Sequence, residues 1–308
     1  MSQSKTKPGA VAPETGGGAH PLHPEKRFFE NGEIRELVER ATDYVRAGVC
    51  VHLTGTAGVG KTSLAFRIAG KLGRPVALML GNEWLTSRDF IGQEIGTTTS
   101  SVVDRYVQSV RRTEKKMVND WQGSILAEAM RKGHTLVYDE FTRATPEANA
   151  NLLSVLEEGV LVSTDSNNPT PFLRAHPDFR IILTSNPHDY VAVNSAPDAL
   201  MDRVVTLPIQ EPGVETMAHM VAQRTGLGFE FSHKITKMVA HFRSERDCTR
   251  VSTMRSAILI ARIAAAKAAA GTLTPPALAK IASDVLAGRG IKASGEQVAA
   301  VLKPKKAA

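Results

Sequence analysis

Short apolar runs recur through the first two thirds of the chain, and longer helix-like stretches separate them. The runs are rich in β-branched residues and occupy residues 49–54, 76–80, 135–138, 181–184 and 204–207. Runs of this length and composition predict strands that are buried on both faces. The stretches between them predict helices at 33–47, 61–72 and 146–157 and a pair of helices within 102–131. Strands that alternate with helices predict an α/β fold with a parallel five-stranded sheet.

The pattern changes after residue 208, beyond which no further strand is predicted. Helical stretches follow at residues 215–225, 232–243, 253–270, 276–286 and 296–302. We therefore expect an α/β domain over residues 28–210 and an all-helical domain over residues 211–302. Residues 1–27 are rich in Gly, Pro and Ser, and residues 303–308 are rich in Lys, so both ends are predicted to be disordered.

Composition excludes several classes of protein. Of the 308 residues, 42% are hydrophobic and 22% are charged, which is typical of soluble globular proteins rather than collagen-like or membrane-embedded ones. Cys50 and Cys248 are distant in sequence and have no partner at metal-ligand spacing, which argues against a disulfide framework or a zinc ribbon and favours a reducing cytoplasm. Residues 1–27 lack the apolar segment of a secretory signal, and no membrane anchor is predicted.

The net charge of +7 at first suggests a nucleic-acid partner. Five of these positive charges lie on residues 1–27 and 303–308, so the body of the protein is nearly neutral. Basic ends bind acidic surfaces weakly and in a strongly salt-dependent way. We therefore interpret the basic ends first as solvated segments, and the charge distribution disfavours a nucleic-acid partner without excluding one.

The strongest chemical signal is the segment GTAGVGKT at residues 55–62, which follows a predicted strand and precedes a predicted helix. Its glycines allow positive φ angles and let backbone N–H groups point inward, which builds an anion nest at a helix N-terminus. Lys61 would reach the β- and γ-phosphates, and the Thr62 hydroxyl would ligate Mg²⁺. The alternative is a structural glycine-rich turn. The residues expected to bind ATP are Gly55, Thr56, Ala57, Gly58, Val59, Gly60, Lys61, Thr62 and Ser63.

Two carboxylates follow the predicted strand at 135–138. Asp139 and Glu140 would lie at the carboxyl edge of the sheet, where ligands bind in open α/β folds. Beside a phosphate loop, Asp139 would hold Mg²⁺ and Glu140 would orient and polarise the attacking water. Consecutive strand residues point to opposite faces, so the two groups could take different roles. The alternative is a solvated acidic loop.

Three further polar residues are candidates for the reaction. Asn186 follows the strand at 181–184 and could position water. Arg203, just before the fifth strand, is either solvated or inserted into the site of a neighbouring copy, and the sequence favours neither. Arg255 lies in the first turn of a predicted helix capped by Ser252 or Thr253. A cation opposes the helix dipole there, which suits a residue that faces a phosphate, although a surface arginine is equally compatible. The scattered histidines, His52 among them, are expected to be structural.

This order of motifs resembles the AAA+ ATPases, which combine an α/β nucleotide domain with a helical lid. In that family the motifs are Walker A, Walker B, a sensor asparagine, an arginine finger and a second-sensor arginine. Residues 156–179 resemble the hairpin that the MoxR branch carries before its sensor strand, and residues 92–103 resemble the insert in its second helix. Residues 138–161, 176–190, 196–209 and 254–263 are similar to the gas vesicle ATPases, and the similarity covers roughly residues 28–270.

The resemblance implies roles, partners and a location. Lys61, Thr62, Asp139, Glu140 and Asn186 would act on Mg-ATP as described above, with Arg203 and Arg255 as arginine finger and second sensor. Whether Arg255 acts in its own subunit or across the interface stays open. The family also implies a ring homo-oligomer, expected to be a hexamer, that works with other gas vesicle proteins in the cytoplasm as a minor gas vesicle component. Hydrolysis would move the lid and remodel a protein client during vesicle assembly or enlargement.

Three other functions remain open at the level of sequence. The first is a MoxR-type chaperone that activates a metabolic enzyme. The second is a nucleotide-binding scaffold of the gas vesicle shell without turnover. The third, a nucleic-acid motor, would need a basic ring interior, which the nearly neutral body makes unlikely.

Overall fold

The computed structural model describes residues 28–103, 113–162, 171–186, 198–245, 248 and 251–302. The two ends predicted to be disordered, residues 1–27 and 303–308, lie outside the described residues.

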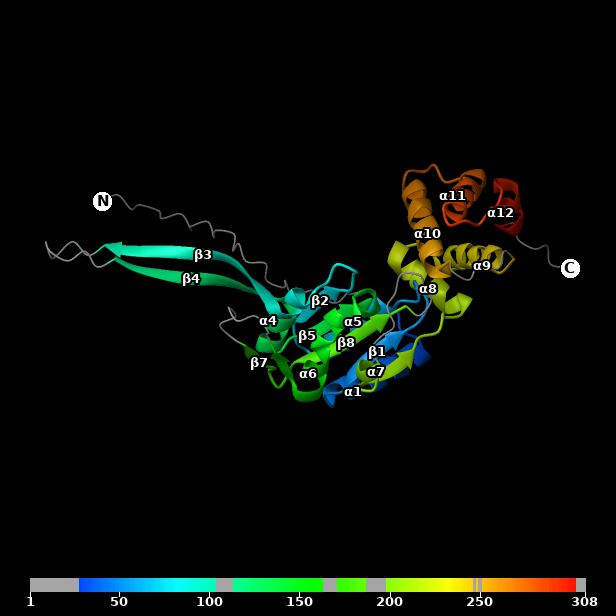
Figure 1. The fold of residues 1–308 in the computed structure, drawn as a ribbon. Helices are drawn as coiled ribbons and strands as arrows, with labels where there is room; N and C mark the ends of the chain where they lie inside the picture. The colour runs from blue at the N-terminus through cyan, green and yellow to red at the C-terminus, as the bar shows by residue number, and fades with distance from the viewer. Residues whose placement is uncertain are drawn as a thin grey trace, which may run out of the picture.

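A five-stranded parallel sheet forms the centre of the α/β part, as predicted (Figure 1). The strand order is β2-β5-β8-β1-β9, with β1 in contact with both β8 and β9. Parallel pairing puts the carboxyl ends of all five strands at one edge of the sheet. The strands are β1 (Cys50–Thr54), β2 (Val76–Leu80), β5 (Thr135–Asp139), β8 (Arg180–Ser185) and β9 (Val204–Pro208).

Helices cover both faces of this sheet. Several begin at side-chain caps that the sequence supplies: Asn31 accepts a hydrogen bond from the Ile34 N–H at 2.9 Å, and Ser124 accepts one from Ala127. The helical segments are α1 (Gly32–Arg46), α2 (Lys61–Lys71), α3 (Ser87–Ile91), α4 (Ile125–Lys132), η1 (Phe141–Arg143), α5 (Pro146–Asn149), α6 (Asn151–Glu158) and α7 (Asp198–Met201).

The pair of helices predicted within 102–131 is wrong. A long antiparallel hairpin, β3 (Gly92–Val103) and β4 (Thr113–Gly123), precedes the single helix α4 and projects away from the sheet (Figure 1). Residues 97–103 read TTTSSVV, and side chains branched at Cβ lose rotamer freedom in helices but fit strands. The stretch that resembles a helix insert therefore forms one arm of this hairpin.

A second, short hairpin precedes β8. Its strands β6 (Val160–Val162) and β7 (Phe172–Arg174) pair antiparallel. The hairpin expected within residues 156–179 is therefore confirmed.

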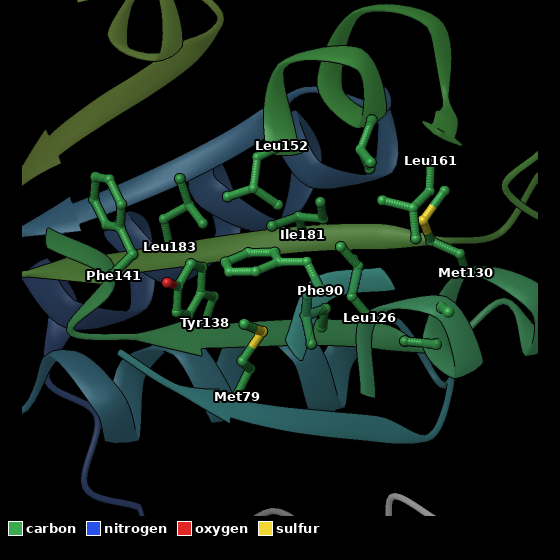
Figure 2. Close-up of a cluster of buried hydrophobic side chains, with 14 of the residues drawn as sticks. Met79, Phe90, Leu126, Met130, Tyr138, Phe141, Leu152, Leu161, Ile181 and Leu183 are labelled. Carbon is green, nitrogen blue, oxygen red and sulfur yellow. The ribbon is translucent and has the colours of Figure 1, made fainter. Parts of the chain in front are cut away.

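The sheet is buried on both faces because its strands alternate their apolar side chains between two clusters. Tyr138 and Leu183 point into one cluster, with Phe90 of α3 and Leu152 of α6 (Figure 2). Val137 and Ile182 belong to the other cluster, with Ile68 of α2. Burial raises the pKa of Tyr138, whose hydroxyl donates a hydrogen bond to Asn149 Oδ1 at 3.0 Å.

The C-terminal part is helical, as predicted, and has its own buried cluster. Val221, Ile235, Ile260 and Leu286 are fully buried there. The described residues beyond Pro208 contain no strand. The division between residues 210 and 211 stays a prediction. The helices are α8 (Val214–Thr225), α9 (Phe229–Glu245), α10 (Thr253–Ala269), α11 (Pro275–Ala287) and α12 (Gly295–Leu302).

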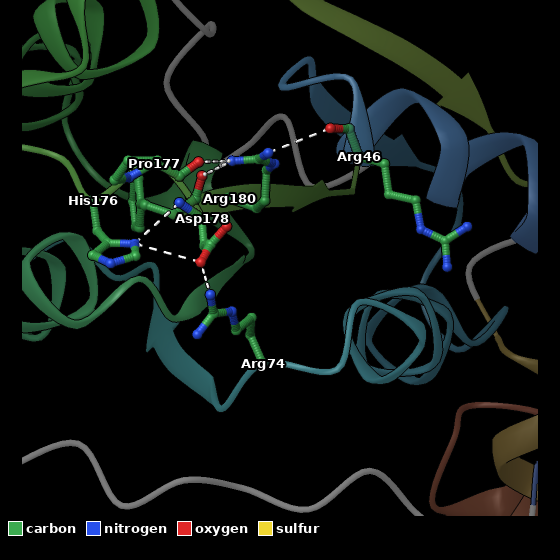
Figure 3. A network of polar contacts seen from close by, with 7 residues as sticks. Arg46, Arg74, His176, Pro177, Asp178 and Arg180 are labelled. Atoms are coloured by element: carbon green, nitrogen blue, oxygen red, sulfur yellow. Dashed lines mark hydrogen bonds and ion pairs between the residues drawn. The ribbon is translucent and has the colours of Figure 1, made fainter.

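A polar network fixes the start of β8 at the amino edge of the sheet (Figure 3). Asp178 forms an ion pair with Arg74, which lies just before β2. Arg180 donates to the carbonyl oxygens of Pro177 and Phe179, both at 2.7 Å, and to that of Arg46 at 3.3 Å. The network therefore ties the turn before β8 to the end of α1 and to the edge strand.

None of the helices within the described ranges combines the length and the apolar character needed to cross a membrane.

The sheet core predicts a contrast between two leucines. Leu183 on β8 is fully buried, whereas Leu80 at the end of β2 is 58% exposed. We expect Leu183→Ala to lower the free energy of unfolding by about 3 kcal/mol, because it leaves a cavity. Leu80→Ala, the matched control, should lower it by less than about 1 kcal/mol. Urea unfolding measures both, and equal losses would contradict the assigned core.

Candidate nucleotide-binding site

A cavity of ≈ 590 Å³ lies at the carboxyl edge of the sheet and extends to the helical part. It brings together most of the residues that the sequence singled out, from four separate stretches of chain. Residues 57–63 of the glycine-rich loop line it together with Asp139, Glu140, Asn186 and Arg255. Arg203 is not among the lining residues. The loop between β1 and α2 is therefore the floor of a cavity and not only a structural turn.

Glycine is required at several points of this loop. Gly58 and Gly60 have φ angles of 83° and 101°, which side chains with a Cβ rarely adopt. A Cβ on Gly55 would lie 2.4 Å from the carbonyl oxygen of Ile209. A Cβ on Gly58 would lie 2.1 Å from Ser252 Oγ, at the start of α10. The loop is thus closely packed against both β9 and the helical part.

Lys61 begins α2 and is only 8% exposed. Its Nζ donates hydrogen bonds to the carbonyl oxygens of Gly55 at 2.7 Å and Thr56 at 2.9 Å. The ammonium is therefore held above the loop. Lys61 is the first residue of α2, and the N-cap Gly60 supplies no side-chain hydrogen bond, so the positive end of the helix dipole is left without a capping group beside this cation. This arrangement suits a polyanion such as a chain of phosphates.

The hydroxyl of Thr62 contacts the carboxylate of Asp139. Thr62 Oγ1 lies 2.9 Å from both Oδ1 and Oδ2, and Asp139 is 9% exposed. Thr184 Oγ1 also donates a hydrogen bond to Asp139 Oδ1. One carboxylate and one hydroxyl thus meet on the cavity wall, and both are oxygen ligands of the kind that Mg²⁺ prefers.

Glu140 differs from the expectation. The sequence predicted that Asp139 and Glu140 point to opposite faces of a strand, but β5 ends at Asp139. Glu140 has a φ of 54° and is the one non-glycine residue with positive φ among the described residues. Its N–H donates to Thr184 Oγ1 at 3.0 Å, and its carboxylate forms an ion pair with Arg143 Nε at 2.8 Å. The left-handed backbone of Glu140, which is a strained conformation for a residue with a side chain, therefore turns its carboxylate away from the strand direction that Asp139 follows.

Asn186 and Arg255 both line the cavity, one from the α/β part and one from the helical part. Asn186 follows β8 directly and is 7% exposed. Arg255 lies in the first turn of α10, and its N–H donates to Ser252 Oγ at 3.2 Å. Ser252, rather than Thr253, is therefore the helix cap.

Arg203 is positioned outside this cavity. Its Nε and Nη2 lie 3.2 and 2.9 Å from Glu157 Oε2, and its side chain is about one third exposed (32%). The geometry therefore separates Arg203 from the phosphate loop of its own chain.

Sequence reasoning missed Arg224, a cavity residue from the helical part. Arg224 on α8 also lines the cavity, and its Nη2 donates to Ser63 Oγ at 2.9 Å. Ser63 and Arg224 are 161 positions apart, so no local pattern connects them.

The segment just before α1 was also missed. Phe28 and Phe29 line the cavity, and the ring of Phe29 stacks on His219 of α8 with centroids 5.1 Å apart. Arg67 of α2 forms an ion pair with Glu30 at 2.6 Å, and its hydrogen bond lowers the pKa of that carboxyl. Two adjacent phenylalanines just before a predicted helix could have indicated that this segment packs against the rest of the protein. This segment supplies the cavity with an aromatic wall.

His52 of β1 is buried behind the phosphate loop, as expected of a structural histidine. It is 4% exposed. Burial, helped by the positive charge of Lys61, lowers its pKa from the ordinary 6.5 to about 4. The imidazole is therefore neutral at physiological pH. Across the described part of the chain, no cluster of three or more His, Cys, Asp or Glu side chains could hold a metal ion.

Comparison with known proteins agrees with this geometry. The family model of the AAA domain (dynein-related subfamily) matches residues 50–204. The gas vesicle ATPase GvpN of Ancylobacter aquaticus is 34% identical over 99% of this chain and 82% of its own length. Its counterpart in Haloferax mediterranei is 36% identical over 77% of this chain and 68% of its own length. Protein CbbQ of Hydrogenophilus thermoluteolus is 23% identical over 68% of this chain and 71% of its own length.

Because Gly58 lies so close to the start of α10, a side chain at this position should lower the affinity for nucleotide. Gly58→Ala adds a Cβ that collides with Ser252, and we expect it to weaken nucleotide binding by about tenfold. Gly48 is the matched control, because its φ of 86° is similar but a Cβ there meets nothing within 4 Å. Gly48→Ala should lower stability by about 1 kcal/mol and leave affinity unchanged. Titration with a fluorescent ADP analogue distinguishes the two, and equal affinities would contradict the assignment.

Proposed function

Because the chain belongs to the gas vesicle ATPase (GvpN) family of MoxR-type AAA+ proteins, we propose that it hydrolyses Mg-ATP to support gas vesicle assembly or enlargement. It binds nucleotide and is an ATPase. Its work would be to remodel a protein client among the other gas vesicle proteins, in the cytoplasm and as a minor gas vesicle component. The observation that carries this proposal is the contact between Thr62 and Asp139 beneath the glycine-rich loop.

The residues around the loop fit ATP. The first N–H groups of α2 have no side-chain cap and can donate to phosphate oxygens. Lys61 would exchange its two carbonyl acceptors for the β- and γ-phosphates. Arg224 and Arg255, from the helical part, line the same cavity and would neutralise further phosphate charge. Phe28 and Phe29 offer an apolar surface that suits the base.

The Thr62 hydroxyl and the Asp139 carboxylate would hold Mg²⁺. Bound there, the ion would neutralise charge on the phosphates. Thr184 donates to the Asp139 carboxylate and accepts from the Glu140 N–H, so it orients that carboxylate and fixes the backbone of Glu140.

Water activation falls to Glu140 and Asn186. Both line the cavity, and Glu140 would accept the proton of the attacking water while Asn186 positions it. Arg143, at 2.8 Å from the Glu140 carboxylate, limits where that group can point. The left-handed backbone of Glu140 also limits the directions that its carboxylate can take.

Arg203 would complete the site of a neighbouring copy. Its separation from its own cavity supports action across an interface. Each copy would then offer an arginine to the next one, a head-to-tail contact that closes into a ring. A hexamer is the ring that we propose.

The role of Glu140 predicts a separation of binding from turnover. Glu140→Gln should lower ATP turnover by about a hundredfold or more, because the amide cannot accept the proton. Its nucleotide affinity should stay within about threefold of the unmutated protein. Glu158→Gln, on the exposed end of α6, is the matched control and should keep full turnover. Phosphate release near the unmutated rate in Glu140→Gln would rule out the assigned role.

If Arg203 acts in the site of a neighbouring copy, mixing two inactive variants should restore ATPase activity. Arg203→Ala and Glu140→Gln should each be inactive, because one lacks the arginine and the other the base. When the two are mixed, an intact Arg203 can enter a site with an intact Glu140, so ATPase activity should reappear. No recovery at any mixing ratio would show that Arg203 acts within its own chain or not at all.

The cellular role can be tested in the host. Deletion of the gene should impair gas vesicles, and a Lys61→Ala copy should fail to restore them, because the variant cannot grip the phosphates. Electron microscopy of the cells provides the readout. Full rescue by Lys61→Ala would instead support a scaffold that needs no turnover.

A further inference from the structure

His52 joins three neighbouring strands through its imidazole. It lies in the middle of β1, between β8 and β9. Its Nε2 is 2.8 Å from Ser185 Oγ on β8, and its Nδ1 is 3.0 Å from Thr206 Oγ1 on β9. Both ring nitrogens therefore have a hydroxyl partner, and the ring links β8 to β9 across β1.

The side chains in contact with His52 lie next to, or within three residues of, candidate site residues. Ser185 directly precedes Asn186. The ring of Phe141, which directly follows Glu140, meets the imidazole edge to face, with centroids 5.3 Å apart. On β9, Thr206 is the middle residue of the strand and lies three residues after Arg203.

Only the neutral ring suits these contacts well. A neutral imidazole has one donor and one acceptor. Ser185 Oγ donates to Thr54 Oγ1 at 3.4 Å, so its oxygen is available to accept from Nε2. Nδ1 then accepts from the Thr206 hydroxyl. Burial and the charge of Lys61 keep the ring neutral by lowering its pKa to about 4.

Resting on the proposed role of Arg203, we propose that His52 is a positioning residue that couples the nucleotide cavity to β9, and so to the arginine offered to the next copy. Its bond to Ser185 holds the end of β8, where Asn186 enters the cavity. Its bond to Thr206 holds β9, the strand that Arg203 immediately precedes. A displacement on one side of the imidazole is thereby transmitted to the other side.

The test replaces the ring with an apolar side chain. His52→Leu removes both hydrogen bonds. The Ser185 and Thr206 hydroxyls can rotate to other partners, so we expect this apolar replacement to leave the protein folded. We expect nucleotide affinity within about threefold and kcat lower by roughly ten- to a hundredfold, because catalytic groups are misplaced. His134→Leu, at the opposite edge of the sheet, is the matched control and should keep kcat within about twofold.

Amide hydrogen exchange measures the proposed coupling between the cavity and β9 without requiring ATP turnover. In the unmutated protein, a non-hydrolysable ATP analogue with Mg²⁺ should slow amide exchange in β9, and in His52→Leu this protection should disappear. If His52→Leu does not fold, Ser185→Ala and Thr206→Val each remove one bond and should each lose the β9 protection. Unchanged kcat, or β9 protection that persists in folded variants, would overturn the proposal.

These readouts separate this proposal from the proposed function. Absence of turnover in the unmutated protein would count against the ATPase role alone, because β9 protection is measured on binding. Normal turnover that His52→Leu leaves intact would count against the coupling alone.

Discussion

The carboxylate of Asp139 is the group on which the site depends. Asp139 is the last residue of β5, is 9% exposed, and accepts hydrogen bonds from Thr62 on α2 and Thr184 on β8. A buried carboxylate is tolerated only when its oxygens are paired in this way. The three-way contact therefore fixes the start of α2, and with it the glycine-rich loop, against the carboxyl edge of the sheet. The same Thr184 hydroxyl accepts the N–H of Glu140, so it also fixes the backbone of the residue that carries the second carboxylate.

The helical part reaches this edge at several separate points. Ser252 packs against Gly58, and Arg224 binds Ser63. The Asn31 side chain donates to Thr216 Oγ1 at 3.3 Å, which adds the segment before α1 to the same contact. Two of these contacts, those of Ser252 and Arg224, are made to the phosphate loop and to the first turn of α2. Contacts of this kind are what an ATPase of this architecture needs to convert loss of a phosphate into movement.

The sequence predicted correctly those elements whose structure depends mainly on neighbouring residues. The five strands were found because each is a short apolar run, and the loop at residues 55–62 was found because glycine spacing encodes its backbone angles. The pair of helices predicted within 102–131 was wrong because residues 113–123 pair with β3 as strand β4, a contact between distant segments, and α4 is the one helix that the described residues there form. The placement of Glu140 differed because strand alternation does not continue past Asp139. Contacts such as that of Arg224 with Ser63 join segments far apart in sequence, so nothing local could have predicted them.

The most direct measurement is the dependence of nucleotide binding on Mg²⁺, followed by calorimetry with a non-hydrolysable ATP analogue. We expect Mg²⁺ to tighten binding by about tenfold or more in the unmutated protein, because Thr62 and Asp139 supply its ligands. Asp139→Asn should bind the analogue without this Mg²⁺ dependence. Failure of the unmutated protein to bind the analogue in the presence of Mg²⁺ would contradict the assignment of the cavity.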